Sequence, residues 1–209
     1  MRRSPARALA LLLAAAPAFV FATAPAAVEA QAQAADPAAQ QIGKFSDALL
    51  GAMKQAKSLG AKGRYSKLEP VISQVFDLPL MTRFAVGTSW STLSPAQQQE
   101  LVKAFSRMTV ATYAHNFDGY NNQKFQLADV QTRGPDKLVH TVLVGGGDKT
   151  NLVYRMRQSG GTWKVIDVYY NGSVSSLLGQ RSEYATTLKS GGASALVKKL
   201  NNHADELLG

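Results

Sequence analysis

The chain of 209 residues contains no cysteine. Disulfide bonds, thiol catalysis and thiolate metal sites are therefore excluded, and we expect no lipid-anchored lipoprotein, which would need a cysteine at its mature N-terminus. Stability must then come from an ordinary apolar core. A chain of this length is long enough to build such a core with a cavity inside it.

Histidine is almost as scarce as cysteine, and its three copies lack the spacing of metal ligands. His115, His140 and His203 fall in a predicted helix, a predicted strand and the C-terminal tail, and there is no HExxH motif. This scatter favours ordinary surface histidines over a metal site. We therefore expect neither a metal nor a cofactor.

Motifs for catalysis, phosphate binding and nucleic-acid binding are also missing. There is no GxSxG motif, and the serine-rich run 173–176 is typical of a helix N-cap. The GGGD segment at 145–148 lacks the GK[ST] ending of a phosphate-binding loop and joins two predicted strands, which indicates a hairpin. The net charge is +9, yet no basic cluster is longer than Lys198-Lys199. We expect no catalytic residue and no nucleic-acid partner, and the charge favours anionic lipid headgroups or an acidic partner.

The N-terminus has the pattern of a secretory signal peptide over residues 1–30. Three arginines precede an apolar run, and small residues follow it. The run is too short and too rich in alanine for a membrane span, which needs about 20 apolar residues. Removing this segment also removes those arginines and Glu29, so the net charge falls from +9 to +7. We expect a periplasmic product with a mobile leader over 31–36 and one domain over 37–209.

The periodicity of apolar residues predicts an α+β fold. Helical spacing predicts helices over residues 37–59, 65–75, 77–87, 95–116, 173–189 and 193–207. Alternation with a period of two predicts strands over residues 124–131, 138–144, 151–157 and 163–170. Short turns rich in glycine separate these strands, so we expect a curled four-stranded antiparallel meander. N-terminal and C-terminal helices should pack against it.

The fourth predicted strand is apolar on both faces. Alternation directs one set of side chains to one face: Trp163, Val165 and Tyr169. It directs another set to the opposite face: Ile166, Val168 and Tyr170. One face of an antiparallel sheet in a small protein is normally wet. Either helices cover both faces of this strand, or one face lines an apolar pocket.

Asp167 lies in the middle of this apolar strand. A carboxylate there is costly unless it is paired, and Arg155 or Arg181 is a natural partner. A structural ion pair is favoured over a general base, because no second acid or nucleophile accompanies Asp167. Two alternatives stay open: an enzyme acting on lipid or cell-wall material through Asp167 or His115, and a periplasmic adaptor with a filled core.

Two segments resemble the MlaC, or toluene-tolerance, family of periplasmic lipid-binding proteins. The first is VFDLPLMTRFAVGTSWSTLSPAQQQELVKAFSRMTVATYAHNF, residues 75–117. The second is WKVIDVYYNGSVSSLLGQRSEYATTLKSGG, residues 163–192. With the strands between them, these segments cover most of the mature chain. The second segment is most similar to the hopanoid-associated HpnM subgroup.

The resemblance implies a soluble carrier that is not an enzyme. Such a carrier holds phospholipid or hopanoid in an apolar cavity between sheet and helices, and moves it between the inner and outer membranes. It implies a monomer that works with an inner-membrane ABC lipid transporter complex and an outer-membrane lipoprotein complex. Each methylene exposed to water costs about 0.8 kcal/mol, which makes a deep cavity necessary. The expected lipid contacts are Leu80, Met81, Phe84, Phe105, Met108, Tyr113, Tyr154, Met156, Ile166, Val168 and Tyr170.

Overall fold

The computed structural model describes residue 31 and residues 33–171 and 174–209, so the predicted signal peptide at 1–30 lies outside the described residues. The helices are α2 (Pro37–Lys54), α3 (Ala56–Val75), α4 (Leu78–Val86), the 3-10 helix η1 (Gly87–Thr92), α5 (Pro95–Asn116) and α6 (Ser176–Leu208). The strands are β1 (Lys124–Arg133), β2 (Asp136–Gly145), β3 (Asp148–Ser159), β4 (Thr162–Tyr170) and β5 (Val174–Ser175). The predicted α+β class is confirmed.

The strands form one antiparallel sheet in the order β1-β2-β3-β4-β5. All four predicted strands are present as consecutive neighbours. The prediction of four strands in total is wrong, because Val174 and Ser175 add a fifth strand that pairs with Tyr170 and Tyr169. A strand of two residues is too short to show an alternating pattern in the sequence.

A β-bulge in β4 changes which side chains share a face. Arg155 of β3 pairs with Asp167, but the next residue, Met156, pairs with Val165. Ile166 therefore has no pairing partner in β3. Val165 therefore lies on the same face as Val168, and Ile166 lies on the opposite face with Asp167. The predicted alternation, which separated Val165 from Val168, is wrong because it assumed an unbroken period of two.

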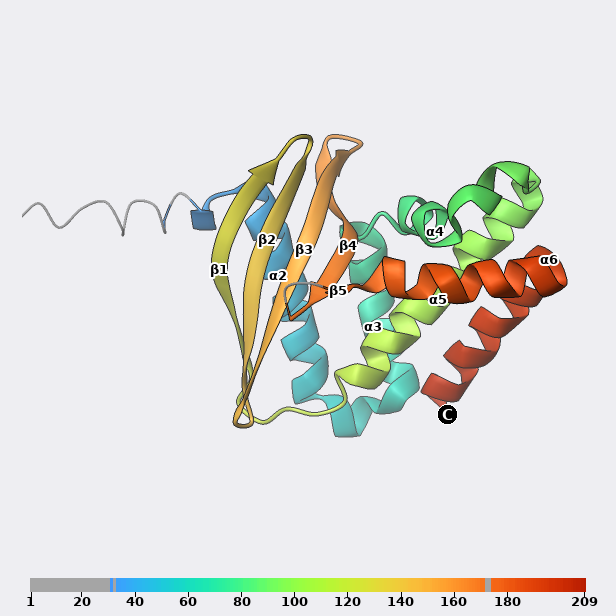
Figure 1. The fold of residues 1–209 in the computed structure, drawn as a ribbon. Coiled ribbons are helices and arrows are strands. Elements are labelled where there is room, and N and C mark those ends of the chain that lie inside the picture. Colours follow the sequence, from blue (N-terminus) through green and yellow to red (C-terminus); the bar gives the residue numbers. More distant parts are fainter. Residues whose placement is uncertain (1–30, 32, 172–173) are drawn as a thin grey trace, which may run out of the picture.

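Helix α2 packs along one face of the sheet (Figure 1). Its N-terminus is capped, since the Asp36 side chain accepts a hydrogen bond from the Ala38 amide and Pro37 occupies the first turn. Its buried stripe includes Phe45, which is fully buried against the sheet. The Phe45 ring meets three others edge to face, with centroid distances of 5.1 Å to Phe76, 5.4 Å to Tyr113 and 6.1 Å to Tyr154.

The remaining helices gather beside β4, at the opposite end of the sheet from β1 (Figure 1). Helix α5 opens with a capping box typical of the S-P-A-Q sequence at 94–97, in which Ser94 and Gln97 cap each other's backbone. The predicted break in the C-terminal helix is confirmed, because Gly192 has a φ of 69° and divides α6. The predicted end of the first helix at Leu59 is wrong, since the non-helical Gln55 ends α2 at Lys54. Within the described part of the chain, no helix combines the length and apolarity needed to cross a membrane.

The aromatic cluster around Phe45 yields a stability prediction. Phe45→Ala should lower the free energy of unfolding by about 3–5 kcal/mol, because it leaves a cavity where three rings meet. Urea denaturation of the purified protein measures this change. Tyr120→Ala, at a side chain that is partly exposed, is the control and should cost less than about 1 kcal/mol. Equal effects of the two substitutions would contradict the central role of Phe45.

Candidate functional site

A hollow of about 560 Å³ opens between β4, α4 and the first half of α6. We call it the basic hollow. Its lining residues are Arg83, Phe84, Gly87, Thr88, Arg155, Ile166, Asp167, Tyr169, Ser175, Leu177, Leu178 and Arg181. It lies on the sheet face opposite α2. The bulge in β4 therefore supplies its floor, because it turns Ile166 to this side.

Apolar side chains cover a large part of the basic hollow. Phe84 from α4 and Leu178 from α6 line it, although both are exposed, Leu178 to 66%. Exposed large apolar side chains in an open hollow are typical of a binding site for an apolar ligand or a partner.

Three arginines, Arg83, Arg155 and Arg181, make the hollow basic. The guanidinium group of Arg181 lies against Gly87, where a Cβ atom would come within 2.6 Å of the Arg181 Nε. Gly87 also has a φ of 69°, a conformation that residues with a side chain rarely adopt. Glycine at position 87 therefore lets α6 bring Arg181 against the end of α4.

Asp167 lies at the inner edge of the hollow and is buried. Its carboxylate accepts hydrogen bonds from Ser175 Oγ at 2.6 Å and from the Val168 amide at 2.9 Å. The Leu177 amide, in the first turn of α6, lies 3.5 Å away. The predicted ion pair with Arg155 or Arg181 is wrong, because hydroxyl and backbone donors at the start of α6 stabilise the charge instead.

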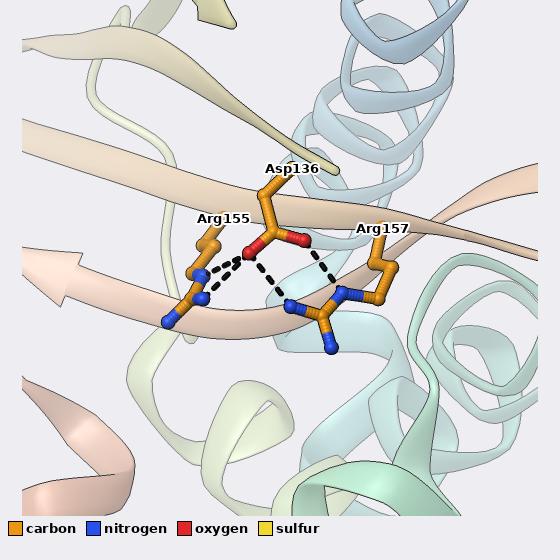
Figure 2. A network of polar contacts seen from close by, with 3 residues as sticks. All are labelled: Asp136, Arg155 and Arg157. Atoms are coloured by element: carbon orange, nitrogen blue, oxygen red, sulfur yellow. Dashed lines mark hydrogen bonds and ion pairs between the residues drawn. The ribbon is translucent and has the colours of Figure 1, made fainter. Parts of the chain in front are cut away.

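Arg155 pairs with Asp136 in a network that also includes Arg157 (Figure 2). Asp136 Oδ2 accepts from Arg155 Nε at 2.7 Å, and Oδ1 accepts from Arg157 Nε at 2.6 Å. Burial alone would raise the pKa of Asp136, but the hydrogen bonds from Arg157 and Arg155 outweigh it and the net pKa lies below its usual value. The network anchors Arg155 at the rim of the basic hollow.

Arg83 and Arg181 form no ion pair with any residue in the described ranges. Since Asp167 is stabilised by neutral donors and Asp136 holds Arg155, the hollow has more positive charge than its own carboxylate balances. Guanidinium groups bind phosphate and carboxylate groups through paired hydrogen bonds. The arrangement therefore suits a ligand with an anionic group and an apolar body.

The structure divides the predicted lipid contacts among three places. Two of them, Phe84 and Ile166, line the basic hollow. Six line a small cavity of about 70 Å³, which we call the inner cavity: Met81, Phe105, Met108, Tyr113, Val168 and Tyr170. Tyr154 and Met156 are fully buried core residues, and Leu80 is half-buried on α4. None of these last three lines either space.

The lipid contacts predicted from the sequence include none of the arginines and leucines of the hollow, although Arg155 and Arg181 were considered as partners of Asp167. Arg83 and Arg181 carry no motif of their own, and only the fold brings α4 and α6 together. Leu178 does carry a signal, because it follows Leu177 directly in the first turn of α6 and so cannot share its buried side.

His115 and Asp167, the two groups considered for catalysis, line no common hollow among those described above. His115 is exposed at the end of α5 and lines none of the hollows described above, while Asp167 is bound to the start of α6. Among the described residues, no group of three or more histidine or acidic side chains is placed to hold a metal ion.

Comparison with known proteins adds a family and a fold. Residues 43–202 match the family described as MlaC protein. The fold is similar to that of a phospholipid-binding protein from Ralstonia solanacearum, solved in complex with a phospholipid. The two chains are 23% identical with a TM-score of 0.73, and the similarity covers 83% of this chain and all of the other. The search of the curated proteins finds no match.

The Asp136 network predicts a pH-dependent contribution to stability. A carboxylate whose pKa is lowered on folding stabilises the folded state above its unfolded pKa, here 3.8, and loses that contribution as the pH falls through the folded pKa. Asp136→Asn should therefore lower the free energy of unfolding at neutral pH by roughly 1–3 kcal/mol. Urea denaturation between pH 7 and pH 3 should show the difference from wild type shrinking below about pH 4. A difference that stays constant over this range would contradict the ion pair.

Proposed function

The chain belongs to the MlaC family, and from this premise we propose that it is a carrier that binds lipid in the basic hollow. One observation carries the proposal: apolar side chains and three arginines line the same open space. A lipid needs both, because its chains must be shielded from water while its headgroup stays hydrated. The similarity to a structure that holds a phospholipid supports the same assignment.

The lining suggests how a lipid lies in the site. Phe84, Ile166 and Leu178 contact the upper part of the chains, and Leu177 leads from the hollow into the inner cavity, since it lines both. The arginines at the rim bind the anionic part of the headgroup. Because an uncharged hopanoid would leave these arginines without a partner, we favour a phospholipid as the ligand.

We place this carrier in the periplasm, where the signal-peptide pattern of residues 1–30 would direct it. There it moves lipid between the inner and outer membranes as a monomer. An inner-membrane ABC lipid transporter complex and an outer-membrane lipoprotein complex would load and unload it. The open basic rim offers a surface that either complex could recognise through acidic groups.

Lipid extraction tests the proposal directly. The protein is purified from a bacterial periplasm and extracted with organic solvent, and the extract is analysed by mass spectrometry. We expect phospholipid in a stoichiometric amount, together with a protein mass that lacks the signal peptide. A lipid-free protein that also takes up no phospholipid from vesicles would overturn the proposal.

Charge reversal tests the role of the arginines. Arg181→Glu should weaken binding of an anionic phospholipid roughly tenfold, because it replaces a guanidinium at the rim with a carboxylate that repels the negative headgroup. A fluorescent phospholipid titrated into lipid-free protein measures the affinity. Lys44→Glu, at an exposed position on α2, makes the same change in net charge and is the control. Equal loss in both variants would show that only the overall charge matters.

A further inference from the structure

The inner cavity contains a buried polar group without a hydrogen-bond partner among the described residues. Gln180, in the first half of α6, lines this cavity. Its Oε1 atom is buried, and no described residue donates a hydrogen bond to it. A buried carbonyl without a partner is destabilising, so natural proteins rarely keep one unless a ligand or water satisfies it.

The neighbours of Gln180 in the cavity do not satisfy it. The nearby hydroxyl of Thr112 donates instead to the Met108 carbonyl oxygen at 2.9 Å. Four other lining residues carry hydroxyl groups, and none of these donates to Gln180 Oε1: Thr109, Tyr113, Tyr170 and Ser176. Gln180 therefore keeps an unpaired carbonyl in a cavity whose lining mixes apolar side chains with hydroxyl groups.

The position of Gln180 places it beyond the headgroup end of the site. The inner cavity shares Leu177 with the basic hollow. On its other side it shares Met108, Thr112 and Gln180 with a hollow of about 710 Å³ between α5 and the two halves of α6. The buried Leu177 thus separates the basic hollow from the inner cavity, and an apolar chain that displaces its side chain would reach Gln180.

We propose that Gln180 recognises a hydroxyl group on the apolar part of the bound lipid. A hydroxyl donates to the Gln180 carbonyl, and because it also accepts, it can pair with either end of the amide. A methylene at the same place leaves the carbonyl unpaired and loses affinity. This inference rests on the proposed lipid-carrier function and narrows its ligand to phospholipids with a hydroxylated chain.

A matched pair of ligands tests the inference. The first ligand is a phosphatidylethanolamine with one hydroxylated acyl chain, prepared as three isomers that carry the hydroxyl near the carboxyl end, in the middle or near the methyl end of the chain. The second ligand has the same acyl chain without the hydroxyl. Wild type should prefer one hydroxylated isomer about tenfold, which corresponds to about 1.4 kcal/mol. Gln180→Leu should abolish that preference, weakening the hydroxylated lipid and strengthening the plain one. Gln99→Leu, at an exposed position on α5, should keep it.

The outcomes separate this inference from the function on which it rests. Equal affinity of wild type for both ligands, or a preference that survives in Gln180→Leu, would overturn the role of Gln180 and indicate that the cavity holds only water around the amide. Failure of wild type to bind either ligand would overturn the carrier function itself. If Gln180→Leu does not fold, Gln180→Met, whose flexible side chain adapts to the cavity, replaces it.

Discussion

The whole site depends on one extra residue in β4. Ile166 has no partner of its own in β3, so the strand bulges and the side chains on either side of it change faces. As a result Val165 and Val168 both join the core that packs on α2. Ile166 and Asp167 face the opposite side, where α4 and α6 border the basic hollow. With regular alternation Ile166 would point into the core, and the hollow would lose its apolar floor.

The bulge also sets the electrostatics. It directs Asp167 toward the start of α6, where the Ser175 hydroxyl and a backbone amide donate hydrogen bonds to its carboxylate, so that no arginine is needed. Asp136, on the neighbouring strand β2 and on the same sheet face, anchors Arg155. Two carboxylates are thus stabilised, and the charges of Arg83 and Arg181 stay available to a ligand. Stability and binding use different groups, although they share one strand.

The sequence was sufficient for features that depend on local pattern. The four long strands, the capping box at Ser94 and the break near Gly192 follow from alternation, hydrogen bonding at helix starts and glycine conformation. The fifth strand and the bulge were not predictable, because neither leaves a periodic signal over two or three residues. The partner of Asp167 was missed for a related reason, since an arginine is the usual expectation and the hydroxyl of Ser175 becomes a partner only after β5 folds back on β4. The site residues were predicted as an apolar set, while the arginines come together only in three dimensions.

The contact between Arg181 and Gly87 has a consequence for sequence variation. Position 87 would not be recognised as part of a binding site from a list of polar or apolar groups, because glycine offers neither. Yet the absence of a side chain is what admits the guanidinium of Arg181. Substitution of Gly87 would displace the Arg181 guanidinium at the rim. It would do so without changing any charged or apolar residue of the hollow. Ligand preference in related chains can therefore diverge through a position that has no side chain of its own to offer the ligand.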